Sequence, residues 1–109
     1  MATLTEAVEK STYVVTLSFT DEAGAAMVPS SCQWSLRDNS GGIVNSRSSV
    51  ATVVATAISI VLSGEDLVYE KNSRGIRTLT VEAVYDGAYG SNLPLNEEFT
   101  IPIRQISGI

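Results

Sequence analysis

The stretch that decides the fold reads Ser31-Cys32-Gln33-Trp34-Ser35-Leu36-Arg37-Asp38, and it holds the only tryptophan and the only cysteine of the chain. Apolar and polar residues alternate along it, so Cys32, Trp34 and Leu36 share one face, which is the two-residue period of a half-buried β-strand. An inward-facing tryptophan supplies a large apolar area over which two sheets can close. We therefore place Trp34 at the centre of the predicted core.

Alternation on both sides of this stretch predicts further strands at residues 11–20, 57–62, 77–86 and 97–106. A short return strand is expected at residues 43–45. Residues 50–56 are rich in β-branched side chains but lack a clean period, so their register stays open between a strand buried on both faces, an edge strand and a bulged strand. Pro102 falls on the outward face of the last strand, where its missing N–H indicates a sheet edge.

The connections carry turn residues. Residues 38–42 give the strongest turn signal, residues 63–67 resemble a capped single turn of helix, and residues 87–94 are expected to form a long loop. Short strands spaced by turns, without a long helical pattern, predict an all-β fold: an antiparallel β-sandwich of about seven strands, with a closed barrel as the alternative.

The length of 109 residues fits one domain. Residues 1–10 are expected to form an N-terminal arm or edge strand, with an amphipathic turn over residues 5–10 as the rival interpretation. Residues 11–109 are expected to form the sandwich domain.

The composition is acidic and low in charge. Seven basic against twelve acidic residues give a net charge of -5, and no two basic residues are adjacent, so we expect neither nucleic acid nor an anionic membrane as a partner. Charged residues are only 17% of the chain, below the roughly 25% usual in soluble domains, which leaves a surface that pairs easily with a neighbour. A single cysteine excludes an internal disulfide.

The residues at the start of the chain lack the pattern of a secretory signal peptide. The longest apolar-rich run, residues 50–62, is too short and too polar to span a bilayer. Synthesis in a cytoplasm is therefore expected.

The chain has no histidine, which rules out Ser-His-Asp and Cys-His nucleophiles and the usual zinc sites. Adjacent carboxylates at residues 21–22, 65–66 and 97–98 are expected to be solvated caps of turns or neighbours on opposite strand faces, with a calcium site as the minor alternative. The glycines follow no phosphate-binding pattern. We expect no enzymatic activity, no cofactor and no metal.

A few tyrosine, arginine and valine positions are candidates for contacts with a partner. Tyr85 is expected in the core and Tyr89 in ordinary loop packing, although tyrosines on loops also favour binding surfaces. Arg77 is expected to be solvated. Val61 and Val84 point outward in the predicted register, and a patch that they share would mark a partner surface.

The order of the strands resembles an immunoglobulin-like or fibronectin type III-like domain, with residues 13–20, 31–38, 58–62, 77–85 and 99–103 in the places of strands B, C, E, F and G. Several phrases are similar to small immunoglobulin-like proteins encoded among the virion structural genes of tailed bacteriophages. They are Ser11-Thr12-Tyr13, Phe19-Thr20-Asp21-Glu22-Ala23-Gly24, Pro29, Trp34-Ser35-Leu36-Arg37-Asp38 with the pair Gly41-Gly42, Leu62-Ser63-Gly64-Glu65-Asp66-Leu67, and Gly90-Ser91-Asn92-Leu93-Pro94-Leu95. The chain departs from secreted antibody-type domains because it lacks a second cysteine and an evident tyrosine corner.

This resemblance implies a non-enzymatic structural or accessory protein of the virion, in capsid decoration or a head-to-tail or neck component, that acts by protein–protein contacts. Its partners would be other virion proteins and possibly copies of itself, and it would reside in the virion after synthesis in the host cytoplasm. The expected contact residues come from the arm, the 86–93 loop and its neighbours, and the tail: Ala2, Leu4, Tyr69, Tyr89, Asn92, Leu93, Ile106 and Ile109. The alternative is a carbohydrate-binding or adhesion module that contacts a cell surface through Tyr69, Tyr85 and Tyr89.

Overall fold

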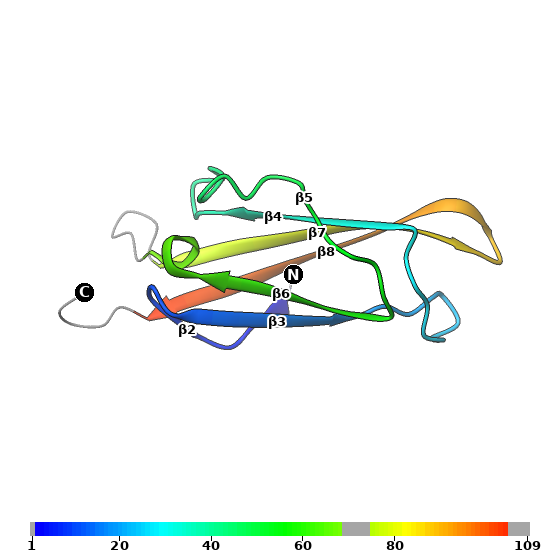
Figure 1. Ribbon diagram of the computed structural model, residues 1–109, viewed down its shortest axis with the longest axis horizontal. Helices are drawn as coiled ribbons and strands as arrows, with labels where there is room; N and C mark the ends of the chain where they lie inside the picture. The colour runs from blue at the N-terminus through cyan, green and yellow to red at the C-terminus, as the bar shows by residue number, and fades with distance from the viewer. Residues whose placement is uncertain (1, 69–74, 105–109) are drawn as a thin grey trace.

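The computed structural model describes residues 2–68 and 75–104 (Figure 1). Its strands are β1 (Ala2–Thr3), β2 (Ala7–Val8), β3 (Thr12–Ser18), β4 (Ser31–Arg37), β5 (Val50–Ala51), β6 (Ala57–Ser63), β7 (Ile76–Gly87) and β8 (Gly90–Arg104). Within these residues the only helical element is the 3-10 turn η1 (Gly64–Leu67). The prediction of an all-β fold is confirmed.

The strands form two sheets of unequal width. A curled mixed sheet, shaped like half a barrel, has the order β1-β8-β7-β4-β5, with β2 also paired to β8. The second sheet contains only β3 and β6, which pair antiparallel along their whole length. In Figure 1 these two strands lie beside the wider sheet, and the β7–β8 hairpin projects past the ends of the other strands.

The arm pairs with the opposite end of the chain. Ala2 lies opposite Phe99 and Ala7 opposite Ile103, and both short ladders are parallel. The prediction of a purely antiparallel arrangement is therefore wrong at β1 and β2. Parallel neighbours need a long connection rather than a hairpin, and here nearly the whole chain lies between the paired segments.

The predicted inward faces of the main strands are confirmed. Along β6 buried and exposed residues alternate without exception, and along β4 Cys32, Trp34 and Leu36 are buried. Residues from both sheets and from the connections share one core, which contains Ala7, Val15, Phe19, Cys32, Trp34, Leu36, Val44, Ile58, Ile60, Leu62, Leu67, Leu79, Val81, Ala83, Ile101 and Ile103. Alternation is thus what sorts these side chains between core and solvent.

The connection between β4 and β6 is less regular than predicted. Residues 43–45 make only an isolated bridge between Arg37 and Ile43, and of residues 50–56 only β5 pairs, with β4. Asn45, Ser46 and Ser49 adopt positive φ angles of 51°, 59° and 51°. Because the left-handed conformation turns the chain out of an extended path, a return strand cannot form there.

The predicted turn at residues 38–42 is present. The Asp38 carboxylate accepts hydrogen bonds from the backbone N–H groups of Ser40 and Gly42, both at 2.9 Å. This is the local capping that makes aspartate frequent in turns.

The loop expected at residues 87–94 is instead a tight hairpin, because β7 runs to Gly87 and β8 starts at Gly90. The register shifts between Tyr85 and Gly87, which forms a bulge on β8. Asn92 has a φ of 55° in this bulge, and its N–H is bound by the Asp86 carboxylate at 3.0 Å. An asparagine tolerates this conformation. The glycines and the asparagine that suggested a loop therefore form the turn and the bulge of the hairpin.

Two adjacent residues of β6 provide a direct test of the core. Leu62 is fully buried, whereas Val61 is 53% exposed. We expect Leu62→Ala to lower the free energy of unfolding by about 2–5 kcal/mol, because it removes buried methyl groups and leaves a cavity. The matched change Val61→Ala should cost at most about 1 kcal/mol. Urea denaturation measures both, and equal losses would contradict the assigned faces.

Candidate interaction surface

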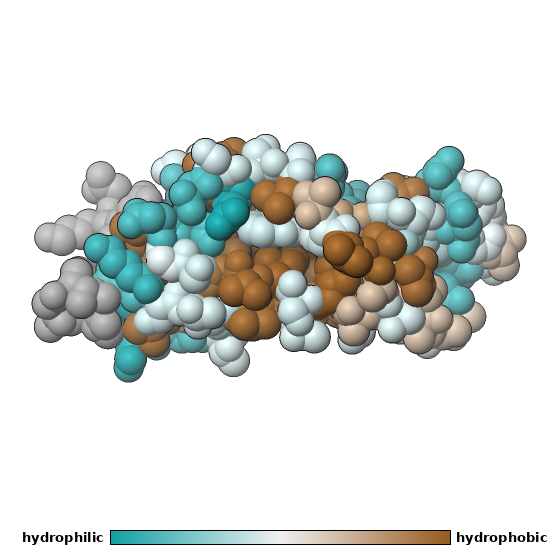
Figure 2. All heavy atoms as spheres, in the orientation of Figure 1, coloured by the Kyte–Doolittle hydropathy of each residue, from teal (hydrophilic) through white to brown (hydrophobic). Residues whose placement is uncertain are grey.

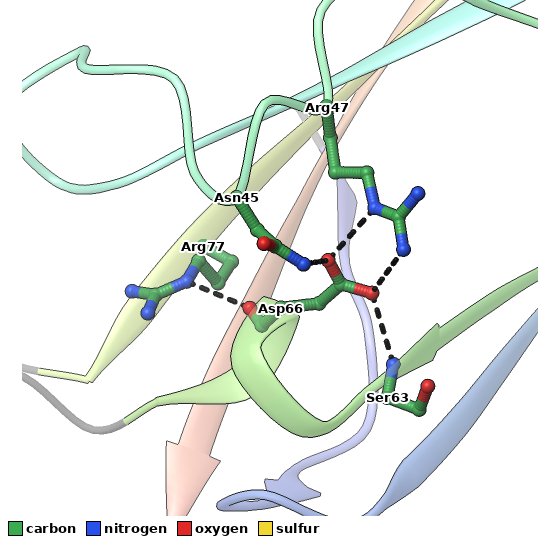
Figure 3. A network of polar contacts seen from close by, with 5 residues as sticks. All are labelled: Asn45, Arg47, Ser63, Asp66 and Arg77. Atoms are coloured by element: carbon green, nitrogen blue, oxygen red, sulfur yellow. Dashed lines mark hydrogen bonds and ion pairs between the residues drawn. The ribbon is translucent and has the colours of Figure 1, made fainter.

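The most connected polar group in the described residues is the carboxylate of Asp66, in the turn η1 (Figure 3). Arg47 Nε and Asn45 Nδ2 both donate to its Oδ1 at 2.9 Å, and the Ser63 N–H donates to Oδ2 at 3.1 Å. Asp66 is fully buried, which corrects the expectation of a solvated cap, although its role as a cap of the helical turn is present. The carboxylate therefore joins η1 to the irregular loop at residues 45–47.

Burial raises the pKa of Asp66, but the hydrogen bonds from Arg47, Asn45 and Ser63, together with the positive charge of Arg47, outweigh this effect and lower it below its ordinary value. The hydrogen bond to Asp66 and the negative charge of its carboxylate raise the pKa of Arg47. The pair is thus held in its ionised form in the folded protein.

Arg77 is a second buried charged residue that the sequence placed in solvent. Its exposed fraction is 0%, because it continues the inward phase of β7 that Leu79 and Val81 follow. Its guanidinium donates to backbone carbonyls: Nε to Asp66 at 3.1 Å, and Nη2 to Val68. The prediction for Arg77 rested on its charge, and it is wrong because carbonyls of a turn distant in the sequence from the strand's inner residues accept the hydrogen bonds of the guanidinium.

These contacts indicate a structural role for the network. Both carboxylate oxygens of Asp66 already accept hydrogen bonds, and no buried side-chain nitrogen or oxygen of the described residues lacks a partner. Within residues 2–68 and 75–104, no three His, Cys, Asp or Glu side chains are grouped closely enough to hold a metal ion. No helix in the same residues is long and apolar enough to cross a membrane.

The first carboxylate pair also serves a turn. Asp21 Oδ1 accepts the N–H groups of Ala23 and Ala25, both at 2.9 Å, as a solvated cap is expected to do. Its neighbour Glu22 accepts a hydrogen bond from the Tyr85 hydroxyl at 2.6 Å. That bond is the main reason why the pKa of Tyr85 is raised. Tyr85 was expected in the core but is half-buried. Its hydrogen bond to Glu22 connects the hairpin to the turn at residues 21–26.

The predicted contact residues separate in space. Ala2 and Leu4 belong to the arm, where Leu4 is half-buried against the core and its N–H donates to Thr100 at 2.8 Å. Tyr69, Ile106 and Ile109 lie outside the described residues. The arm residues are thus engaged within the fold itself.

Three of the predicted contacts gather at the β7–β8 hairpin. Tyr89, in the two-residue turn, is 79% exposed, Asn92 is exposed, and Leu93 is half-buried opposite Tyr85. The turn therefore presents one aromatic side chain to solvent on a paired, bulged support.

Exposed valines form a second apolar area. Val14 and Val61 lie directly opposite each other on β3 and β6, and each is 53% exposed. Val53, in the link from β5 to β6, is 87% exposed. In the view of Figure 2, apolar atoms gather near the middle of the molecule. Val84 lies in the other sheet, opposite Ser31, so it is not on the same sheet as Val61.

One feature that the sequence did not indicate is a groove between the two sheets. It has a volume of about 250 Å³ and is lined by Leu17 and Phe19 on one side and by Leu95, Glu97 and Phe99 on the other. The groove lies between β3 and β8, beyond the part of β8 with which the arm pairs. No sequence signal marks the groove, because it depends on where the arm lies in the fold.

Compared with known protein families, curated proteins and solved structures, the chain matches none of them.

The Asp66 network generates a pH-dependent prediction. Since the pKa of Asp66 is lower in the folded than in the unfolded chain, its stabilisation is complete above the ordinary aspartate pKa of about 3.9 and is lost as the pH falls through the lower folded value. We expect Asp66→Asn to reduce the free energy of unfolding at pH 7 by about 3 kcal/mol. It should also reduce the loss of stability in acid.

Urea denaturation between pH 7 and pH 2 measures both effects. The matched control is Glu65→Gln, which neutralises the exposed neighbour and should change stability by less than about 0.5 kcal/mol. If Asp66→Asn and the unmodified chain lost stability equally on acidification, Asp66 would not be the group that titrates.

Proposed function

We propose that the chain is an immunoglobulin-like β-sandwich that serves as a non-enzymatic structural or accessory protein of a tailed-phage virion. It holds its place through surface contacts with other virion proteins, in capsid decoration or in the neck and tail. The virion assignment derives from the similar sequence phrases, and the contact role from the exposed features of the fold.

The strand order supports the immunoglobulin-like assignment. In that fold strands C, F and G form one sheet, a strand C′ can lie beside C, and strands B and E belong to the other sheet. The order β8-β7-β4-β5 agrees with G-F-C-C′, and the pair β3–β6 agrees with B and E. Within the described residues no strand occupies the place of A beside β3 or of D beside β6, so the smaller sheet is narrower than usual.

The observation that carries the contact role is the projecting hairpin. The body measures 52 × 22 × 21 Å, and the β7–β8 hairpin extends along its long axis (Figure 1). Its turn exposes Tyr89, and the Tyr85–Glu22 hydrogen bond holds the hairpin near this turn against the connection that contains Glu22. Aromatic residues that are held rigidly and enter a partner's pocket supply much of the binding energy of protein interfaces. Because the chain carries a net charge of -5, a basic partner surface suits it best.

An exposed tyrosine also stacks on sugars, so the adhesion alternative shares one observation with the leading proposal. The hydroxyl of Tyr85, however, already donates a hydrogen bond to Glu22. Tyr69 lies outside the described residues, and of the two described tyrosines in that alternative Tyr89 is the more exposed, at 79%.

Particle assembly tests the proposal. Cells that assemble the virion are supplied with the unmodified chain, with Tyr89→Ala or with the control Val53→Ala, which changes an equally exposed side chain away from the hairpin. Particles are banded on a density gradient, and the bound chain is quantified by mass spectrometry. We expect the unmodified chain to band with the particles and Tyr89→Ala to weaken this binding at least about tenfold, since truncating a hot-spot residue costs about 2 kcal/mol or more and about 1.4 kcal/mol is already tenfold.

A chain that stays at the top of the gradient in every case would overturn the virion role. Binding of the isolated monomer to a glycan array, lost in Tyr89→Ala, would then establish the adhesion alternative. Equal losses for Val53→Ala and Tyr89→Ala would leave the hairpin without a special role and refute that part of the proposal.

A further inference from the structure

The edge of β3 that faces away from β6 is open. Phe19 N donates to Thr56 at 2.9 Å and Ser11 accepts from Gly64 at 3.2 Å, so the odd-numbered residues of this strand direct their backbone groups toward β6. Successive residues of a strand point their backbone groups to opposite sides. Thr16 and Ser18 therefore point theirs away from β6, where no strand of the described residues pairs with them. An unpaired edge of this kind is a template for another strand.

The edge of β8 that faces the same gap is protected. Leu4 N binds Thr100 O, so the even-numbered residues of β8 direct their backbone groups outward. Pro94, near the groove, and Pro102, beside the paired arm, are both even-numbered and present no outward N–H. The outward N–H of Glu98 is already bound at 3.1 Å by the Glu97 carboxylate. Prolines and charged residues are the usual means by which an edge resists pairing, whereas β3 contains neither.

The groove described above lies between these two edges. It extends from Leu17 and Phe19 across to Leu95 and Phe99, with a volume of about 250 Å³. This is below the range of about 300–1,000 Å³ that suits small-molecule ligands. A strand added to the edge of β3 would direct every second side chain into it, because side chains alternate between the two faces.

Charge decides which strand fits. Glu97 lines the groove and is in register with the core residue Val81, so it stands on the inward face of β8. No ion pair of Glu97 occurs within residues 2–68 and 75–104. A second copy, docked edge to edge, would present β3, which has no Lys or Arg, and would bring together two chains of net charge -5. A segment that carries a Lys or Arg at an inward position would instead form an ion pair with the Glu97 carboxylate.

We propose that the free edge of β3 is a strand-addition site for an extended segment of another protein, in which apolar residues alternate with polar ones and a Lys or Arg meets Glu97. The segment pairs with Thr16 and Ser18 and fills the groove with its apolar side chains. This mode of recognition draws affinity from backbone hydrogen bonds and specificity from the pockets beneath. The inference deepens the proposed function and rests on it for the kind of partner.

Synthetic peptides test the site with the full chain. The probe is a nine-residue peptide of alternating threonine and valine in which lysine replaces the middle valine, and the matched peptide carries glutamate there. Binding to the ¹⁵N-labelled chain is followed by amide chemical shifts. We expect the lysine peptide to shift the amides of residues 14–19 and 95–99, and to bind at least fivefold more tightly than the glutamate peptide.

Two proline substitutions locate the edge. Thr16 and Ser59 lie opposite each other, and each directs its N–H away from the other, toward the free edge of its own strand. Thr16→Pro removes an N–H from the β3 edge and Ser59→Pro removes one from the β6 edge, while both keep the ladder between the two strands. We expect Thr16→Pro to abolish binding and Ser59→Pro to preserve it, with the folding of each variant checked by urea denaturation.

Two glutamine substitutions test the charge without risk to the fold. Glu97→Gln should remove the preference for the lysine peptide, whereas Glu98→Gln, on the opposite face of the same strand, should leave the preference intact. If the two variants behaved alike, Glu97 would not select the partner.

The proposal is overturned if neither peptide binds at about 1 mM, or if Ser59→Pro rather than Thr16→Pro abolishes binding. It is also overturned if sedimentation shows that the chain is a dimer and that Thr16→Pro makes it a monomer, because a second copy would then occupy the β3 edge. The two proposals fail separately. A chain that bands with particles but binds no peptide retains its virion role and loses this site, and a chain that binds the peptide but never bands with particles retains the site alone.

Discussion

The two-stranded sheet is too narrow to cover the inner face of the six-stranded sheet, and this mismatch in width shapes the rest of the molecule. β3 and β6 supply Val15, Ile58, Ile60 and Leu62 to the core. The arm, paired in parallel with β8, closes the gap beside β3 over part of its length. Where the arm does not reach, the gap remains as a groove with one protected edge and one open edge. The part of the gap that the arm closes helps to cover the core, and the part that it leaves open is the proposed docking site.

The buried polar network solves a related problem at the end of the β6–η1 segment. There the chain must turn from one sheet to the other, and a turn leaves backbone groups without strand partners. The Asp66 carboxylate binds the Ser63 N–H, and the Arg77 guanidinium binds the carbonyls of residues 66 and 68. Arg47 and Asn45 attach the irregular loop to the same carboxylate. A crossover that lacks regular pairing is thereby held by side chains.

Alternation predicted the faces of β6 because that strand has one face against the core and one in solvent, so apolar and polar residues alternate along it. On β4 it predicted the inward face correctly, but Ser35 on the opposite face is buried as well, where its hydroxyl accepts the Ser49 N–H at 2.9 Å. The expectation that Arg77 is solvated came from its charge, since alternation places residue 77 on the inward face of β7; it is buried because carbonyls of residues 66 and 68 accept its hydrogen bonds. The sequence also indicated a loop at residues 87–94, because the signals of a bulge and a two-residue turn are the same glycines and asparagine that mark loops. Among the contact residues, the exposure of Tyr89 follows from its place in a turn, whereas the engagement of Leu4 with the core does not follow from any local pattern.

The sequence by itself determined the all-β class, the inward faces of the main strands, the turn at Asp38 and the absence of histidine chemistry. Each of these depends on residues that are close in the chain or on composition alone. Only the tertiary structure decided that the arm pairs with β8, that Asp66 and Arg77 are buried, and that the β3 edge stays open beside a groove that contains Glu97. These features join segments that are far apart in the chain, and their energies depend on which segments meet, so no local pattern of residues could specify them.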